Sequence, residues 1–233
     1  MPDAHKMTLL SKSNFASTWI DQFEPSDRRV ARGLIDKIML VTRDELSGGL
    51  VSILDLIMAG RQDQTRPIAL YAEREVTRTD GELDAFFPGT EAGRATGPGV
   101  SPVAADDLEV GSEGTIANLI TGYARLHRGS ILSHPGPDRM RSDRVGTIVV
   151  VADFIGSGKR VYEMLEAFAR VATIQSWRSL GYIDFYVLAY SGTSNGIAHV
   201  QSSRLDPKII LVKGCPTVYN AFHGVERDQV IRV

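Results

Sequence analysis

A glycine-rich turn directly after an apolar run holds the residues best suited to chemistry in this 233-residue chain. Residues 147–165 read TIVVVADFIGSGKRVYEML, which predicts a buried strand, a tight turn and then a helix. One carboxylate, Asp153, stands near the end of the predicted strand. The turn after it offers backbone amides, a hydroxyl and two cations, contributed by Gly156, Ser157, Gly158, Lys159 and Arg160.

The chemistry of this turn suits a phosphate group. Glycines let backbone N–H groups approach a ligand closely, and the N-terminus of a helix favours an anion. Ser157 adds a hydroxyl donor, while Lys159 and Arg160 add positive charge. The alternative is a turn that only connects a strand to a helix. In a parallel sheet the turn would lie at the carboxyl ends of the strands, where such sheets bind ligands.

Apolar runs that alternate with helical patterns predict the sheet that would position this turn. Strand-like runs lie at 66–75, 148–151, 182–190 and 208–212, with helical patterns between them. This alternation predicts an α/β fold with a Rossmann-like parallel sheet and right-handed crossovers.

Two further segments complete the predicted organisation. Residues 1–62 read as an N-terminal helical segment, within which Thr42-Arg43-Asp44-Glu45 has the form of a capping box. Residues 63–233 read as the α/β domain. They include an irregular stretch at 77–112, rich in Gly, Pro and acids, which we interpret as a mobile, solvated acidic insertion.

A second glycine turn raises the alternative of a serine hydrolase. Residues 192–196, GTSNG, fit the G-x-S-x-G nucleophile turn, and Asp206 and His223 follow Ser194 in the required order. The chain ends at residue 233, which leaves little room for the strands that usually present the acid and the histidine. Ser194 as a residue of a helix N-terminus is therefore the favoured interpretation.

The first turn also resembles a family motif. The stretch IVVVADFIGSGKR resembles the phosphoribosyl-pyrophosphate (PRPP) motif of type I phosphoribosyltransferases, in which four apolar residues and two acids precede a phosphate loop. This resemblance implies that Asp153 holds the ribose hydroxyls and that residues 157–160 bind the 5′-phosphate. It also implies that EVGSEGT (109–115), with Ser112, Glu113 and Gly114, contacts the pyrophosphate or its Mg²⁺.

The basic stretch 128–144 occupies the place of the family's flexible catalytic loop. The resemblance thus implies a lid in which Arg139, Arg141 and Arg144 clamp the leaving pyrophosphate, with Arg141 and Arg144 as catalytic residues beside Asp153. Mg²⁺ would be held mainly through the pyrophosphate of the ligand, and no His or Cys spacing predicts a separate protein-bound metal.

Segments along residues 14–215 are similar to phosphoribosyltransferase-like proteins of prokaryotic conflict (antiphage) systems, whose motif reads D-D-F-x-G-[ST]-G. Here Ala152 stands at the first acid. In the phosphate loop, which is Thr-Gly-Gly-Thr-like in the type I motif, Arg160 replaces the final Thr or Ser. Losing one charged hydrogen-bond partner costs about 1.5–3 kcal/mol, which weakens a site without abolishing it. Two functions stay open: phosphoribosyl transfer to a base, as a defence effector, or a catalytically degenerate nucleotide-binding domain that regulates a protein partner.

Composition narrows the class of protein. A net charge of −2 gives no strong signal for nucleic acid. No run approaches the ~18 apolar residues of a membrane helix, and the single cysteine suits a reducing cytoplasm. We therefore expect a cytoplasmic protein without a membrane segment, and homo-oligomers stay open.

Overall fold

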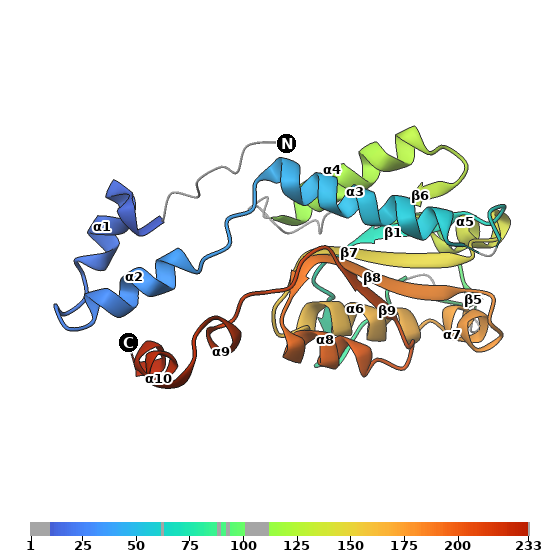
Figure 1. Cartoon of the computed structure of the whole chain (residues 1–233). Coiled ribbons are helices and arrows are strands. Elements are labelled where there is room, and N and C mark those ends of the chain that lie inside the picture. The colour runs from blue at the N-terminus through green and yellow to red at the C-terminus, as the bar shows by residue number, and fades with distance from the viewer. Residues whose placement is uncertain (1–9, 62, 88–89, 92–93, 101–111, 233) are drawn as a thin grey trace. The chain divides into compact units, whose positions relative to one another are not determined.

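The computed structural model describes residues 10–61, 63–87, 90–91, 94–100 and 112–232 (Figure 1). Its contacts divide the chain into two compact units. The larger unit, Thr42–Gly214, holds the sheet, and the smaller one combines residues up to Val41 with Cys215–Val233. The contacts thus group the residues from Thr42 onward with the sheet. The sequence suggested a domain boundary after residue 62, and that boundary stays a prediction.

The larger unit is built on a five-stranded parallel sheet of order β6-β1-β7-β8-β9. This confirms the predicted α/β fold. In chain order the sheet strands are β1 (Ile68–Ala72), β6 (Ile131–Ser133), β7 (Thr147–Ile155), β8 (Asp184–Gly192) and β9 (Lys208–Leu211). Their apolar runs are buried because helices cover both faces of the sheet.

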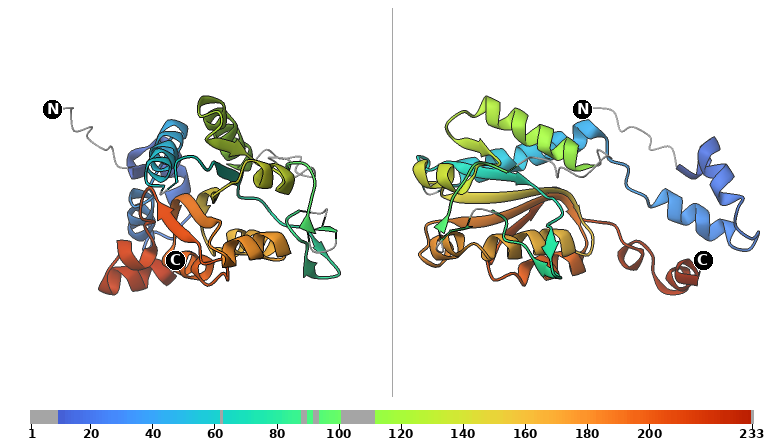
Figure 2. Two further views of the ribbon diagram at one scale, coloured as in Figure 1. Left: turned by 90° about the vertical axis from the view of Figure 1, so that its right-hand side faces the viewer. Right: turned by 180° about the vertical axis from the view of Figure 1, so that it is seen from behind.

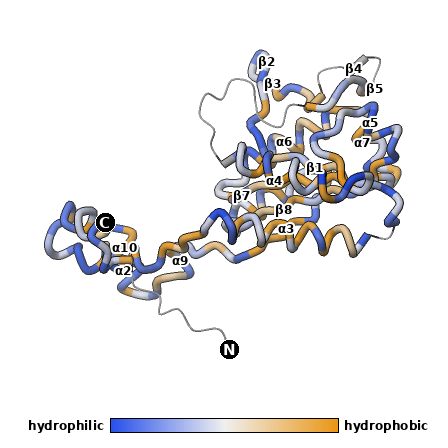
Figure 3. The backbone as a smooth tube through the Cα atoms, turned by 90° about the horizontal axis from the view of Figure 1, so that it is seen from above, coloured by the Kyte–Doolittle hydropathy of each residue, from blue (hydrophilic) through white to orange (hydrophobic). Residues whose placement is uncertain are grey.

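The helices lie in two layers (Figures 1 and 2). One face of the sheet carries α3 (Arg43–Ala59) and α4 (Ser112–Leu126), and the other carries α6 (Lys159–Ala169), α7 (Ala172–Ser179) and α8 (Ser194–Gln201). A short helix, α5 (Pro137–Ser142), connects β6 to β7. Figure 3 shows hydrophobic stretches recurring along α3, whose apolar side packs on the sheet.

The predicted capping box of α3 is confirmed. The Glu45 N–H donates to Thr42 Oγ1 at 3.2 Å, and the Thr42 N–H donates to Glu45 Oε2 at 2.9 Å. Both bonds satisfy N-terminal amides that the helix itself leaves without partners.

The stretch predicted as a solvated insertion is anchored in the core. Phe86 and Phe87 are buried, and Phe86 stacks on Phe168 with ring centroids 3.9 Å apart. Two short hairpins flank these residues: β2 (Arg78–Thr79) with β3 (Glu82–Leu83), and β4 (Thr90–Glu91) with β5 (Arg94–Ala95). Residues 88–89, 92–93 and 101–111 lie outside the described part of the chain.

The smaller unit is helical. It contains a 3₁₀ turn, η1 (Leu10–Lys12), and the helices α1 (Asn14–Ile20), α2 (Arg28–Asp36), α9 (Val218–Ala221) and α10 (Gly224–Arg232). Its core includes Ala16, Ile20, Ala31 and Ile35, and α2 packs against α10. Among the described residues of both units, no helix is long and apolar enough to cross a membrane.

Candidate phosphate-binding site

The sheet has its topological switch point between β1 and β7. The connection from β1 to β6 first passes the short hairpins beside α6 and α7 and then runs through α4 on one face, whereas the connection from β7 to β8 runs through α6 on the other (Figure 1). In parallel sheets the diverging connections open a crevice at the carboxyl ends of the two strands, and ligands bind there. Ala72 is paired with Val151, and the Glu73 N–H donates to the Val151 carbonyl at 2.8 Å. Glu73 therefore lies beside Ala152, with Asp153 one residue further along β7.

The predicted phosphate turn occupies this crevice edge. Gly158 is the N-cap of α6, with a positive φ of 75°, and as a glycine it has no side chain to cap the helix. The Lys159 N–H makes a long bond, 3.4 Å, to Ser157 Oγ. Amides at the N-terminus of α6 are thus available to an anion. The nearby Asp153 side chain is half-buried, and its Oδ1 accepts a 2.7 Å hydrogen bond from the Phe154 N–H. Lys159 is largely exposed, 3.9 Å from Glu163.

The turn is fixed by α8, which packs directly beneath it. A methyl group at Gly158 would overlap the Gly196 carbonyl, and one at Gly196 would overlap the Gly156 carbonyl. Thr193 Oγ1 donates to the Gly156 carbonyl at 2.6 Å and accepts from the Gly196 N–H at 3.0 Å. These glycines are required by close backbone approach, and the approach holds the turn in a preset shape.

A histidine adds a further restraint on the turn. His199 Nδ1 lies 3.1 Å from the Ser157 carbonyl, so this nitrogen must carry the hydrogen. Its ring stacks on Tyr162 with centroids 4.5 Å apart. His199 of α8 therefore links this helix both to the phosphate turn and to α6.

Three charged residues from three elements meet in the crevice. Arg160 Nε lies 3.2 Å from Glu73 Oε1, and the same guanidinium also contacts Glu113 in the first turn of α4. Both carboxylates are almost buried. Burial raises the pKa of Glu73, the charge of Arg160 opposes that rise, and Asp153 adds to it. Asp153 is therefore close enough to Glu73 to repel it electrostatically.

The environment of Glu113 suits an additional cation or donor. Its Oε2 atom is buried and has no hydrogen-bond partner among the described residues. Carboxylate oxygens suit Mg²⁺, which usually combines one or two of them with waters and phosphate oxygens. Within the described residues, no three His, Cys, Asp or Glu side chains are placed to hold a metal by themselves. Glu113 and Asp153 thus fit a Mg²⁺ that a phosphorylated ligand carries.

The structure does not bring the predicted arginine clamp to Asp153. The basic stretch forms β6 and α5 and leads into the amino end of β7 at Thr147. Asp153 lies six residues further along that strand, which at ~3.3 Å per residue separates it from Thr147 by about 20 Å. Arg141 donates to Asp138 and to the Ala95 carbonyl, at 3.0 Å each. Arg139 pairs with Asp143, and the Arg144 carbonyl accepts from Arg66. We therefore leave these arginines out of the site.

The serine hydrolase arrangement is likewise not assembled. Ser194 begins α8 at an exposed position, directly after its N-cap Thr193. Asp206 accepts from Arg178 at 3.3 Å, and His223 belongs to the other unit. The glycines of this turn serve the contact with the phosphate turn described above.

Sequence reasoning missed Glu73, Thr193 and His199. The sequence did contain a signal for Glu73, because it is an acid directly after a buried apolar strand. A residue in that position lies at the carboxyl edge of the sheet, where ligands bind. His134 was also overlooked. It is buried, and its Nε2 accepts from the Ala72 N–H at 2.9 Å. Burial, with the nearby Arg74, lowers the pKa of His134 to about 4.

A parallel sheet with the strand order of a flavodoxin-like fold, a glycine-rich turn at its switch point and neighbouring acids define an α/β domain of the type I phosphoribosyltransferase kind. The chain belongs to the PRTase-CE family, the phosphoribosyltransferases of conflict systems, whose model matches residues 16–228. No curated protein and no solved structure matches the chain.

Proposed function

We propose that this protein binds PRPP, or a related ribose 5-phosphate compound, with Mg²⁺ in the crevice between β1 and β7. The observation that carries the proposal is the glycine-led N-terminus of α6 at the switch point, held in shape by α8 and preceded by Asp153. The 5′-phosphate would accept hydrogen bonds from the amides of residues 156–160. Membership of the PRTase-CE family supports this assignment.

Glu73 would supply the carboxylate that Ala152 lacks. A ribose presents two neighbouring hydroxyls, and two acids of the motif would ordinarily accept from them. The Glu73 backbone bonds to Val151, so its side chain originates beside Ala152 on the adjacent strand. Asp153 and Glu73 would then hold the ribose together, from two strands rather than one.

Arg160 would exchange partners when the ligand binds. In the structure it is held by Glu73 and Glu113. A phosphate carries more charge than one carboxylate and accepts from a guanidinium in the same forked geometry. Its arrival would draw Arg160 away and free Glu113 for Mg²⁺, which would stabilise negative charge on the pyrophosphate.

Phosphoribosyl transfer is the reaction that this arrangement favours. A nitrogen of the acceptor would form a bond to C1′ as the C1′–O bond to pyrophosphate breaks, with the electron pair leaving on pyrophosphate and the proton of the nitrogen lost to solvent. Positive charge develops on the ribose during this step, and the Asp153 carboxylate beside the ribose would stabilise it.

A second candidate is a binding domain without turnover that regulates a protein partner. Ala152 in the motif and an arginine already paired with two acids favour this reading. It predicts the same ligand and differs in the absence of pyrophosphate release.

Calorimetric titration of PRPP into the wild type and Asp153→Ala, with and without Mg²⁺, tests the proposal. Loss of one charge-assisted hydrogen bond, about 1.5–3 kcal/mol, should weaken binding about 10- to 150-fold. The matched control is Asp184→Ala, a half-exposed carboxylate at the opposite end of the neighbouring strand β8. Its affinity should equal that of the wild type.

Each outcome separates the candidates. Absence of PRPP binding by the wild type would refute the proposed ligand, and equal loss in both variants would refute the role of Asp153. Pyrophosphate release during incubation with a panel of bases would favour the transferase. Tight binding without release from any base would favour the regulatory domain.

A further inference from the structure

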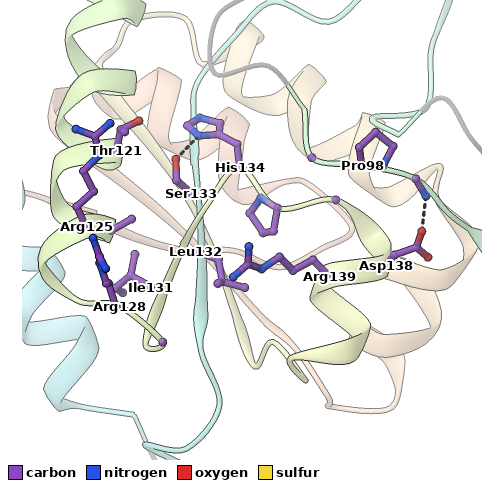
Figure 4. A pocket seen from close by; sticks show the side chains of 16 residues that line it. Pro98, Thr121, Arg125, Arg128, Ile131, Leu132, Ser133, His134, Asp138 and Arg139 are labelled. Carbon is purple, nitrogen blue, oxygen red and sulfur yellow. Dashed lines mark hydrogen bonds between the residues drawn. The ribbon is translucent and has the colours of Figure 1, made fainter.

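A separate cavity of about 970 Å³ lies along β6, the outermost strand of the sheet (Figure 4). Strand β6 runs along it, while α4 with the turn after it and α5 with residues 97–99 form the two sides. We call this cavity the β6 groove. Its described lining includes no Phe, Tyr or Trp side chain.

Part of the backbone edge of β6 has no partner strand among the described residues. The strand pairs with β1 alone, through bonds from the Ile68 N–H to the Ser130 carbonyl and from the His134 N–H to the Leu70 carbonyl. Backbone direction alternates along a strand, so the groups of Ile131 and Ser133 face away from β1. The Ile131 N–H donates to the His127 carbonyl at 3.0 Å, which leaves the Ser133 groups and the Ile131 carbonyl for a further strand. An unpaired strand edge of this kind is a template for another extended chain.

Positive charge borders the groove from both sides. Figure 4 shows Arg125 and Arg128 on one side and Arg139 extending from the other side toward Leu132. Arg125 and Arg128 are exposed and have no ion-pair partner among the described residues. Arg139 is mostly exposed and makes a single pair with Asp143 on its own helix segment. The one acid of the lining, Asp138, is already bonded to Arg141 and the Gly97 N–H.

We propose that the β6 groove binds an extended acidic segment of a partner protein, which adds as a strand beside β6. Backbone pairing would use the open edge, and alternate acidic side chains would face the arginines. A nucleic acid would carry the same charge, but the described lining holds no Phe, Tyr or Trp ring, on which single-stranded bases commonly stack. The inference does not depend on PRPP binding.

Fluorescence anisotropy with a labelled hexapeptide of alternating Val and Glu tests the proposal on the full chain. We expect saturable binding that weakens with salt and falls about tenfold in the double variant Arg125→Gln and Arg128→Gln. The control is Lys208→Gln on β9, the opposite edge of the sheet, which should bind within twofold of the wild type. Thermal melting of each variant checks that the fold is intact.

Two altered probes test the mode of binding. A hexapeptide with proline at its centre lacks one backbone donor and should bind at least fivefold more weakly. Oligothymidylate of matched charge should bind more weakly than the acidic peptide. Four results would each overturn the proposal. The peptide fails to bind at millimolar concentration, the proline probe binds equally well, the oligonucleotide binds more tightly than the peptide, or the control variant loses as much affinity as the double variant.

Discussion

Replacing Arg160 by Gln should destabilise the α/β unit mainly above the pH at which carboxyl groups ionise. The change leaves Glu73 and Glu113 facing each other without a cation, and their side chains are only 10% and 12% exposed. Breaking a buried ion pair costs about 3–5 kcal/mol. The Arg160 side chain is itself 45% exposed, so solvent screens part of this interaction. We therefore expect Arg160→Gln to lower the free energy of unfolding by about 1–3 kcal/mol at pH 7.5.

The pH dependence follows from the direction of the pKa shift. Burial raises the pKa of folded Glu73, and Arg160 opposes this rise. Without Arg160 the pKa should rise further, so that the folded variant holds a proton that the unfolded chain has lost. An acid whose folded pKa is raised loses stability as pH rises from the unfolded pKa to the folded one. The deficit of the variant should therefore shrink as pH falls from 7.5 toward the ordinary Glu pKa.

Urea unfolding at pH 7.5 and pH 5 measures this effect. A Trp19→Phe background leaves Trp177 as the tryptophan, so fluorescence reports the α/β unit. The control is Arg170→Gln, whose side chain is 39% exposed but pairs with Glu82, itself 74% exposed. An exposed pair contributes at most about 1 kcal/mol. Equal losses in the two variants, or a deficit for Arg160→Gln that does not change with pH, would refute the reasoning.

Two other perturbations follow from the site. Gly196→Ala should lower the free energy of unfolding by about 1–3 kcal/mol and weaken PRPP binding, because its methyl group displaces the phosphate turn. The control Gly48→Ala has open space around the new methyl group and should stabilise the protein slightly. Equal effects of the two changes would contradict the close approach of Gly196 to the phosphate turn. His134, with a pKa of about 4, should show no NMR titration between pH 8 and pH 5. Since its folded pKa lies below the ordinary value of 6.5, it should cost stability as pH falls through that window, by about 2 kcal/mol at pH 5; titration near pH 6.5 would contradict its burial.

The structural features that could be predicted from the sequence are those that depend on residues close together in the chain. The parallel sheet, the capping box at Thr42 and the strand-turn-helix around Asp153 each follow from periodicity or spacing within a few residues. Gly49 shows the limit of this reasoning. In sequence it only weakens a helix, yet a Cβ there would lie 3.1 Å from the Tyr190 ring, so the glycine permits α3 to approach the sheet.

The resemblance to the family placed Glu113 and Arg160 at one ligand, but Glu73 and the ion pairs that join the three residues could not be predicted, because these residues are far apart in the chain. Glu73, Glu113 and Arg160 follow β1, begin α4 and begin α6, and only the strand order brings them together. The structure places the arginines of the expected clamp away from Asp153 for a related reason. Composition gives the charge of a segment but not the end of the sheet to which it leads, and Arg141 and Arg144 precede the amino end of β7.

The smaller unit has a consequence for how the protein is made. Helix α2 precedes the α/β unit in the chain, while its partner α10 follows it. During synthesis α1 and α2 can pack on each other as soon as both have emerged, but the side of α2 that contacts α10 stays open to chaperones or neighbouring chains until translation has passed α10. A chain cut short within the α/β unit would keep that side of α2 exposed, whatever the state of the sheet.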